Sequence, residues 1–213
     1  MITAIVLAGG KSERMGSPKA LLDFDGRLCI DLVIAACRRA GVDEVIVVLG
    51  HRADETAKVL GPQVRTVVNA NYESGQTSSF KTGVAHLPDE CDGFLLFPVD
   101  FPLVSDKDVS LLLNAFCKRD EGAKVFIPSH SNKRGHPVLL DGGLRDEIMS
   151  LGDDEPARNI ILRDDSRIHY VNVKNPGVFE DMDSIEDYRR LLALYREMHI
   201  NERKHPPSDS RTF

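Results

Sequence analysis

Long apolar runs are missing from this 213-residue sequence. None approaches the roughly 18 consecutive apolar residues that a membrane-spanning helix needs, so we expect no membrane partner. The chain opens with Met1-Ile2-Thr3 directly into an apolar segment, without the basic start and apolar core of a secretory signal. These absences predict a cytoplasmic protein.

Cysteine is scarce, and its four copies are widely spaced. No two form the C-x-x-C pair that is typical of metal sites and redox motifs. Each lies in an apolar or helical context, so the sequence predicts reduced, partly buried thiols instead of disulfides or metal ligands. The four positions are Cys29, Cys37, Cys91 and Cys117.

An excess of positive charge is also missing. The chain has 27 basic and 33 acidic residues and a net charge of −6, which argues against non-specific nucleic-acid binding but permits a local basic pocket. Apolar residues make up 42% of the chain and charged residues 28%, as is typical of a globular protein with a real core. We expect one domain over residues 1–200. The polar, aperiodic residues 201–213 are expected to form a flexible tail.

Two familiar phosphate-binding motifs are absent from the first glycine-rich loop. The glycine that follows Gly10 is Gly16, and Ser17-Pro18 stands where a P-loop would have Lys-Ser or Lys-Thr. The loop contains no G-x-G-x-x-G either. A P-loop NTPase and an ordinary dinucleotide-binding dehydrogenase are therefore disfavoured.

The same loop nevertheless has the features of a polyphosphate site. The apolar run Ile2–Leu7 predicts a buried strand, and Gly9-Gly10 after it lets the backbone approach a ligand closely. Exposed backbone N–H groups followed by cations suit a polyphosphate, although a glycine turn with solvated charges is the simpler alternative. The cations are Lys11, Arg14 and Lys19.

Apolar runs alternate with helical patterns along the rest of the chain, which predicts an α/β fold with a mainly parallel sheet. Further strands are expected at residues 44–49, 64–68, 93–97, 124–128, 137–140 and 168–173. Helices are expected at residues 28–40, 53–60, 77–86, 105–118, 144–149, 156–162 and 184–198.

Two segments between these elements are candidates for substrate contacts. In the polar segment 69–83, Thr77 or Ser78 is expected to cap a helix whose first N–H groups would face a ligand; a plain capped helix is the alternative. In the basic segment 129–136, cationic side chains around Gly135 could meet an anionic substrate, unless the segment is only a solvated hairpin. The cationic candidates are Lys133, Arg134 and His136.

Acidic residues follow two predicted elements in positions that suit chemistry. Asp100 stands between Pro98 and Pro102 at the carboxyl end of a strand, where open α/β sheets bind ligands and where a carboxylate could hold Mg²⁺. An ordinary turn aspartate is the alternative. Asp181 and Asp183 precede the final helix, whose Ser184 and Asp187 also form a plausible N-cap pair.

Five motifs occur together in an order that resembles a known family. They are LAGGKSERMGSPK at 7–19, ESGQTSSFKTGV at 73–84, FPVDFPLV at 97–104, RGHPVLL at 134–140 and DMDSIEDY at 181–188. The chain resembles the molybdenum-cofactor nucleotidyltransferases, which act as molybdopterin guanylyl- or cytidylyltransferases, over nearly its whole length apart from the tail. The resemblance implies a three-layer, Rossmann-like α/β fold of the nucleotide-diphospho-sugar transferase type.

Position by position, the resemblance implies a role for each motif. Nucleotide-framing residues would be Leu7, Ala8, Gly9 and Gly10, with Arg14 and Lys19 on the phosphates and Gly75 and Ser78 near the base and ribose. Mg²⁺ would be held by Asp100 and Asp183, with Asp181 as the competing second ligand. The acceptor would lie near Arg134, Gly135 and His136. Catalysis would depend on Arg14, Lys19 and Asp100.

The chain departs from the family pattern in two places. Gly9 matches the guanylyl branch, whereas the remaining motifs look more like the cytidylyl branch, so the base preference between CTP and GTP stays open. The usual Asp-Thr-Pro-Glu-Asp ending is here Asp183-Ser184-Ile185-Glu186-Asp187, which leaves the shape of that loop and the second metal ligand open.

The resemblance implies Mg²⁺-dependent transfer of a nucleoside monophosphate from an NTP to a molybdopterin-type phosphate, with release of pyrophosphate. The acceptor phosphate is largely ionised at neutral pH, so no general base is required. Contact with a molybdoenzyme or a maturation factor is a further expectation. The alternatives are a sugar-phosphate nucleotidyltransferase and a non-catalytic carrier of nucleotide or cofactor.

Overall fold

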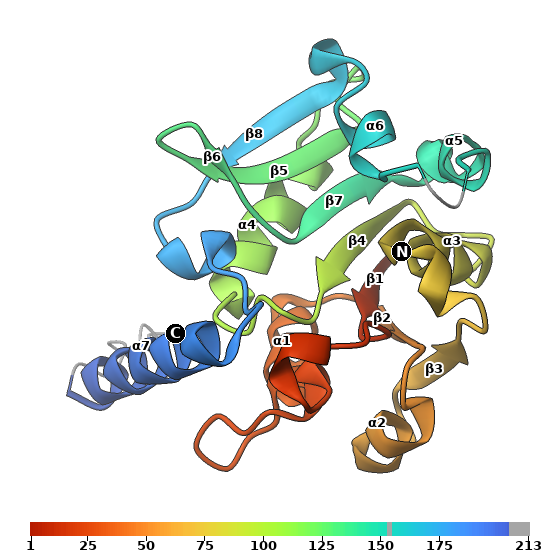
Figure 1. Ribbon diagram of the computed structural model, residues 1–213. Helices are drawn as coiled ribbons and strands as arrows, with labels where there is room; N and C mark the ends of the chain where they lie inside the picture. The colour runs from red at the N-terminus through yellow and green to blue at the C-terminus, as the bar shows by residue number, and fades with distance from the viewer. Residues whose placement is uncertain (153–154, 205–213) are drawn as a thin grey trace.

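The computed structural model describes residues 1–152 and 155–204. Within that range, eight strands form one sheet in the order β3-β2-β1-β4-β7-β5-β6, with β8 paired to β5 (Figure 1). Their bounds are β1 Ile2–Leu7, β2 Glu44–Leu49, β3 Arg65–Val68, β4 Gly93–Pro98, β5 Val125–His130, β6 Lys133–Arg134, β7 Val138–Asp141 and β8 Ile168–Asn172.

The sheet is mixed, with its parallel part around β1. Strands β1 to β4 pair in parallel, and so do β5 and β8, whereas β7 runs antiparallel to both β4 and β5. The predicted α/β class with a mainly parallel sheet is therefore confirmed. Strand β7 runs antiparallel to β5 because the chain turns back directly after β5 through the short hairpin with β6. A parallel neighbour would need a long crossover connection.

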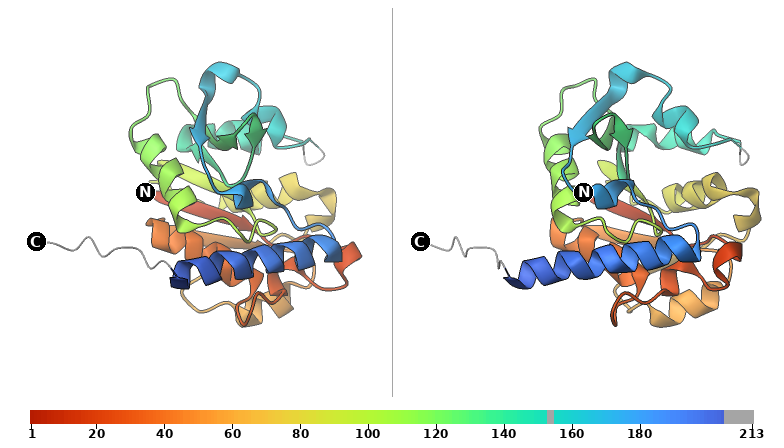
Figure 2. Two further views of the ribbon diagram at one scale, coloured as in Figure 1. Left: turned by 90° about the vertical axis from the view of Figure 1, so that its left-hand side faces the viewer. Right: turned by 60° about the vertical axis from the view of Figure 1, so that its left-hand side comes forward.

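Helices cover both faces of the sheet, as the side views in Figure 2 show. The bounds of the α-helices are α1 Cys29–Ala40, α2 Ala53–Val59, α3 Gln76–Ala85, α4 Asp106–Cys117, α5 Arg145–Met149, α6 Arg158–Ile161 and α7 Ile185–Lys204. Strand β1 shows why both faces are needed. Its Ala4 and Val6 join the core under α1 and α4, while Ile5 and Leu7 join the core under α3, α5 and α6. A strand that is apolar on both sides must be buried on both sides.

Helix α7 returns across the chain to pack beside the loop that follows β1 (Figures 1 and 2). Tyr188 and Tyr195 make edge contacts with Phe24, at ring-centroid distances of 5.5 and 5.6 Å. Leu191 is fully buried, and Arg196 forms a bidentate ion pair with Asp25. These contacts fix the start of α7, and with it the acidic residues before the helix.

Most predicted helices and strands lie within a few residues of their observed positions. The N-cap of α3 is an exception, because the helix begins at Gln76 and its cap residue is Gly75, instead of Thr77 or Ser78. Helix α7 extends through Lys204 into the first residues of the segment predicted as a tail. The rest of that predicted tail, residues 205–213, and the acidic pair Asp153-Asp154 lie outside the described residues.

The expectations about cysteine and membrane segments can be compared with the described residues. All four cysteine thiols are free, and three are buried, whereas Cys117 is exposed. Burial raises the pKa of the Cys37 thiol to about 12, which keeps it protonated and unreactive. No helix among residues 1–152 and 155–204 has the length and apolar character needed to cross a membrane.

Candidate active site

Three loops meet at the carboxyl ends of β1 and β4. The backbone of Val99 donates to Leu7 O at 3.0 Å, and that of Ala8 donates to Val48 O at 2.9 Å, so the three strand ends form one edge. Open α/β sheets bind their ligands at this edge. The loop after β1, the loop after β4 and the segment before α7 each place a charged side chain there.

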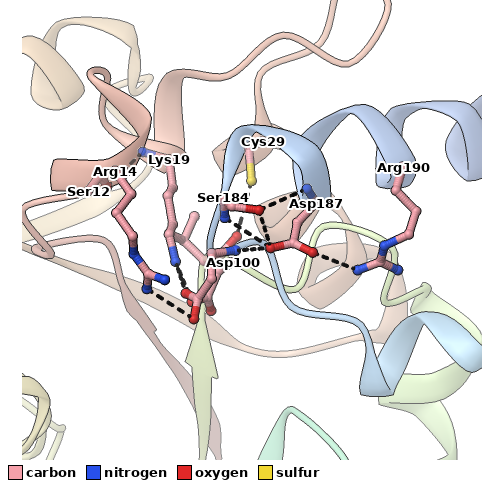
Figure 3. A network of polar contacts seen from close by, with 10 residues as sticks. Ser12, Arg14, Lys19, Cys29, Asp100, Ser184, Asp187 and Arg190 are labelled. Atoms are coloured by element: carbon pink, nitrogen blue, oxygen red, sulfur yellow. Dashed lines mark hydrogen bonds and ion pairs between the residues drawn. The ribbon is translucent and has the colours of Figure 1, made fainter.

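Lys19 lies at the centre of these charges (Figure 3). Its Nζ donates to Asp100 Oδ2 at 3.1 Å and to Asp183 Oδ1 at 2.7 Å. Arg14 adds a longer ion pair to Asp183, with Nη2 and Oδ2 3.5 Å apart. The structure thus brings together two predicted phosphate-binding residues and both predicted metal ligands.

The backbone around Lys19 explains why its side chain reaches this position. Pro18 is buried and leads into a single 3₁₀ turn, Lys19–Leu21, whose Ala20 packs into the core. The backbone N–H of Lys19 donates to Ser12 Oγ at 3.3 Å, which ties the two ends of the loop together. The backbone of Lys19 is therefore anchored, while its ammonium group faces the carboxylates.

The charges in this cluster support one another's ionised forms. Burial opposes the charged form of Lys19, but the charges of Asp100 and Asp183 outweigh it and raise the Lys19 pKa. The hydrogen bond from Lys19 and its charge lower the pKa of Asp183. The Lys19 ammonium and the Asp183 carboxylate are therefore both charged at neutral pH.

Asp181 differs from Asp183 in its surroundings. Its pKa is raised by burial and by the neighbouring negative charge of Asp183. Its side chain has no ion pair with Lys19 or Arg14 among the described contacts, whereas Asp183 has both. The geometry therefore favours Asp183 over Asp181 as the second acidic residue of the cluster.

Asp100 has one carboxylate oxygen to spare for a ligand. Its Oδ1 is buried and has no hydrogen-bond partner within the described chain, although Oδ2 binds Lys19. Unpaired buried polar atoms are rare and call for an explanation, and a bound cation supplies one here. Two carboxylates suit Mg²⁺, which usually keeps water and substrate phosphate as its other ligands. No group of three or more potential metal ligands occurs among residues 1–152 and 155–204.

A cavity of about 570 Å³ lies above this cluster. Its wall contains the glycine loop, the cations and both carboxylates, so a polyphosphate in the cavity would meet cations and backbone N–H groups together. The lining residues named in the sequence prediction are Leu7, Ala8, Gly9, Gly10, Arg14, Lys19, Gly75, Asp100 and Asp183.

Ser78 does not line this cavity in the described part of the chain. Its hydroxyl proton is shared between Asn71 O and Gly75 O, both 2.9 Å from Oγ, and the oxygen accepts from Asn69 Nδ2 at 2.9 Å. Ser78 thereby holds the loop before α3 in shape, and its neighbour Ser79 lines the cavity instead.

Gly9 is required by a close approach of two backbones. A Cβ atom at Gly9 would lie 3.0 Å from Gly50 N and 3.2 Å from Gly50 Cα. The carbonyl of Gly9 also accepts a hydrogen bond from His51 N at 3.0 Å. The glycine at this position therefore has a packing reason that is independent of base recognition.

A second cavity of about 600 Å³ adjoins the first. The predicted acceptor residues Arg134, Gly135 and His136 line it, and Gly75 and Gln76 are shared by both cavities. Its floor is apolar, and its described lining contains basic but no acidic side chains. The remaining lining residues are Ser74, Thr77, Leu96, Ile127, Val138, Pro156, Ala157, Arg158, Ile161 and Leu162.

His136 lines the second cavity and lies near enough to Asp100 for that charge to act on its imidazole. Burial lowers the pKa of its imidazole, and the charge of Asp100 only partly opposes this, so the ring is neutral near pH 7. Its ring packs on Phe101 at a centroid distance of 4.7 Å, and its Nδ1 is buried without a hydrogen-bond partner in the described chain. A Cβ at Gly135 would lie 2.3 Å from Val178 O, so the loop packs tightly at this point.

Several lining residues were not predicted from the sequence. Tyr72, Gln76 and Ser79 belong to the first cavity, and Arg158 belongs to the second. Ser79 gave no signal that distinguished it from Ser78, since only the start of α3 decides which hydroxyl faces outward. Arg158 lies in a short helix that reaches the cavity through tertiary packing, which no local pattern reports.

This arrangement suits a transfer between two bound anions. One cavity offers glycine backbone and cations for a polyphosphate and contains Lys19, Asp100 and Asp183 in its wall. The other, which shares Gly75 and Gln76 with it, offers an apolar floor with arginines. A reaction of this kind depends on placement and on charge stabilisation, and it needs no covalent nucleophile from the protein.

Comparisons with known sequences point to one family. Residues 4–168 match the family described as MobA-like NTP transferase domain. A protein named nicotine blue oxidoreductase from Paenarthrobacter nicotinovorans is 30% identical over 90% of this chain and 96% of its own length. The molybdenum cofactor cytidylyltransferase of Escherichia coli is 25% identical over 92% of this chain and 98% of its own. A probable molybdenum cofactor guanylyltransferase from Bacillus cytotoxicus is 23% identical over the same shares of the two chains.

Solved structures agree with this result. A nucleotidyl transferase from Methanothermobacter has a TM-score of 0.79 and 27% identity, over 93% of this chain and 99% of its own. A crystal structure from Mycobacterium sp. strain JC1 also has a TM-score of 0.79 and 27% identity, over 92% of this chain and 98% of its own. The predicted family and the predicted fold are both confirmed.

Proposed function

The chain belongs to the MobA-like NTP transferase family, and from this premise we propose that it transfers a nucleoside monophosphate from CTP or GTP to a molybdopterin-type phosphate monoester. Pyrophosphate leaves in the same step. Its relatives include proteins named as molybdenum cofactor cytidylyl- and guanylyltransferases, which supports this acceptor.

The observation that carries the proposal is the convergence of Lys19, Asp100 and Asp183 beside two adjoining cavities. An acceptor phosphate oxygen attacks the α-phosphorus of the nucleotide, so both anions must lie together. Lys19 and Arg14 neutralise the phosphates, while the glycine loop offers its N–H groups. The protein supplies position and charge, and the acceptor phosphate is already ionised near pH 7.

Asp100 and Asp183 would hold a divalent cation, with Mg²⁺ as the expected ion. When bound, such a cation supplies charge stabilisation for the phosphate oxygens. The unpaired Oδ1 of Asp100 supports this assignment. The contacts of Asp183 with Lys19 and Arg14 favour it over Asp181 as the second ligand.

The second cavity is assigned to the acceptor. Its apolar floor suits a ring system, and Arg134 and Arg158 suit an anionic or electron-rich acceptor. A sugar phosphate would leave the apolar residues Ile127 and Ile161 in contact with hydroxyl groups. This feature favours molybdopterin over a sugar-phosphate acceptor.

The test is pyrophosphate release with each of the four NTPs, with Mg²⁺, and with or without molybdopterin. We expect release only with molybdopterin present and with CTP or GTP as donor. Pyrophosphate release with sugar phosphates instead of molybdopterin would identify a sugar-phosphate nucleotidyltransferase. Nucleotide binding without pyrophosphate release would indicate a non-catalytic carrier. If none of the four NTPs supports pyrophosphate release, the proposal is overturned.

The matched variant is Asp100→Ala. It should reduce turnover by at least about 10²–10³-fold, the usual cost of losing one preorganised electrostatic group, while the fold stays intact by circular dichroism. Because a relative is named as an oxidoreductase, the same preparations should also be assayed for redox turnover of nicotine blue as a control. Wild-type-like transfer by Asp100→Ala would contradict the assigned role.

A further inference from the structure

The ammonium group of Lys19 lies where the two candidate metal-binding carboxylates converge. It is hydrogen-bonded to Asp100 at 3.1 Å (Figure 3). It is also hydrogen-bonded to Asp183 at 2.7 Å, so it bridges the two carboxylates. A divalent cation that bridges the same two oxygens, Asp100 Oδ2 and Asp183 Oδ1, would need the position that the ammonium group occupies. The two cations therefore exclude each other at this point.

The formal charges of the cluster sum to zero. Lys19 and Arg14 balance Asp100 and Asp183, and all four are joined by ion pairs. A divalent cation that arrives alone must either displace Lys19 or add two positive charges that these four side chains do not balance. A nucleoside triphosphate changes this balance, because its phosphates give both Lys19 and Arg14 new anionic partners in the same cavity.

Lys19 can change partners without a change of fold. Its backbone N–H is hydrogen-bonded to Ser12 Oγ, and its neighbour Ala20 is buried, so the backbone stays in place while the flexible side chain turns. Lys19 lines the same cavity as Gly9 and Gly10, whose backbone would face the phosphates. The movement needed is a change of side-chain rotamer.

We propose that Lys19 holds the place of the divalent cation between Asp100 and Asp183, so that the metal enters with the nucleotide and not before it. This inference rests on the proposed function, because it concerns the same carboxylates and phosphates. Linkage makes the effect reciprocal: nucleotide raises the affinity for metal by the same factor by which metal raises the affinity for nucleotide. The site would thus avoid binding metal unproductively in the absence of substrate.

The experiment measures Mn²⁺ binding directly, by electron paramagnetic resonance of the free ion, without nucleotide. Wild-type protein is compared with Lys19→Met, which keeps an unbranched side chain of similar length but removes its charge. We expect Lys19→Met to bind Mn²⁺ at least about tenfold more tightly, within the range of typical coupling between sites. The double variant Lys19→Met/Asp100→Asn should lose this gain, because one carboxylate ligand is gone.

Two further variants separate the place-holding role from general effects. Lys19→Arg keeps the positive charge between the carboxylates, so its Mn²⁺ affinity should stay within about threefold of wild type. Lys11→Met removes a cation that lines the same cavity but forms its ion pair with Glu73, at 2.8 Å. Its Mn²⁺ affinity should also stay within about threefold, since exposed charges are strongly screened.

A second arm adds a non-hydrolysable CTP or GTP analogue. In wild type the analogue should raise Mn²⁺ binding to the protein about tenfold or more, and in Lys19→Met this enhancement should be smaller. Equal Mn²⁺ affinities of wild type and Lys19→Met without nucleotide would overturn the inference but leave the proposed function standing. If neither protein binds Mn²⁺ even with the nucleotide analogue present, the metal site does not exist, and the proposed metal-dependent transfer is contradicted as well.

Discussion

Gly9 and Gly50 bring the ends of β1 and β2 into direct backbone contact, and Gly9 is part of the wall of the first cavity. A Cβ at Gly50 would lie 2.7 Å from Gly9 O and 2.6 Å from Tyr72 Cβ. Single atoms at these positions therefore decide whether the loops that line the cavity can approach one another.

The first prediction concerns this contact. Gly9→Ala should lower the free energy of unfolding by about 1–3 kcal/mol, because the backbone of Gly50 has to move to admit the new methyl group. The control is Gly10→Ala, since a Cβ at Gly10 meets nothing within 4 Å, and its stability should change by less than about 1 kcal/mol. Urea denaturation without ligand measures both variants, and equal stabilities would contradict the packing role of Gly9.

The same variant also tests base choice. If Gly9 takes part in selecting the base, Gly9→Ala will change the ratio of turnover with CTP to turnover with GTP. An unchanged ratio would restrict Gly9 to packing. The backbone contact with Gly50 favours that outcome.

A second prediction at this scale distinguishes the two candidate metal ligands. Asp183→Asn should reduce transfer by about 10²-fold or more, because Asp183 is ion-paired to Lys19 and Arg14 at the centre of the cluster. Asp181→Asn, two residues away, should retain transfer within about tenfold of wild type. Steady-state pyrophosphate release at saturating nucleotide measures both, and the opposite ranking would identify Asp181 as the ligand.

At the scale of elements, the N-terminus of α7 positions the segment that carries Asp183. Asp187 accepts hydrogen bonds from Ser184 Oγ at 2.7 Å and from the backbone N–H groups of Ser184 and Asp183, at 3.0 and 3.2 Å. An ion pair with Arg190 at 3.2 Å fixes the other oxygen of this carboxylate (Figure 3). The cap therefore holds the backbone of Asp183 as well as the helix.

The third prediction follows from the protonation of this cap. The Ser184 side chain and then Arg190 lower the pKa of Asp187 from its ordinary 3.8 to about 2. A depressed pKa in the folded state stabilises the fold above pH 3.8, and that stability is lost as pH falls toward 2. Asp187→Asn should therefore have a lower Tm than wild type at pH 7, and the difference should shrink between pH 4 and pH 2.

Thermal unfolding at several pH values measures this difference between the two proteins. Glu186→Gln provides the control, because Glu186 is exposed in the same helical turn. This substitution removes one negative charge, as Asp187→Asn does. Its Tm difference from wild type should be small at every pH. A constant difference between Asp187→Asn and wild type down to pH 2 would contradict the linkage.

The sequence allowed most of these elements to be predicted, because buried strands and amphipathic helices leave periodic patterns. Helix α4 is an example, since a helix was predicted at residues 105–118 and is observed at Asp106–Cys117, behind a capping box of Ser105 and Asp108. The start of α3 was predicted less well. Its cap is Gly75, which has no side chain to donate or accept, and the competing hydroxyls of Thr77 and Ser78 look equally suitable in sequence.

At the scale of the whole molecule, α7 joins the C-terminal part of the described chain to the loop after β1. Leu191 is fully buried in the same core as Phe24, and Tyr188 donates to Asp23 O at 2.5 Å. This docking, more than the local sequence, brings Asp183 beside Lys19. For the same reason, the pairing of Lys19 with Asp183 was predictable only through the resemblance to a family, since no local pattern relates residues so far apart.

The fourth prediction tests this docking. Leu191→Ala should lower the free energy of unfolding by about 2–5 kcal/mol, as expected for a buried leucine. Met198→Ala, in an exposed position of the same helix, should cost less than about 0.5 kcal/mol. Chemical denaturation measures both, and equal costs would show that α7 contributes little to stability.

The docking of α7 also has a consequence for biosynthesis. A ribosome that has translated β8 has already made every described residue of both cavities except Asp183. Until the segment beyond residue 180 emerges and α7 folds back, Lys19 can pair only with Asp100, and the second carboxylate is missing. A chain that ends before residue 181 would therefore lack one of the two carboxylates that pair with Lys19, and the polar cluster is complete only after this last segment has been made.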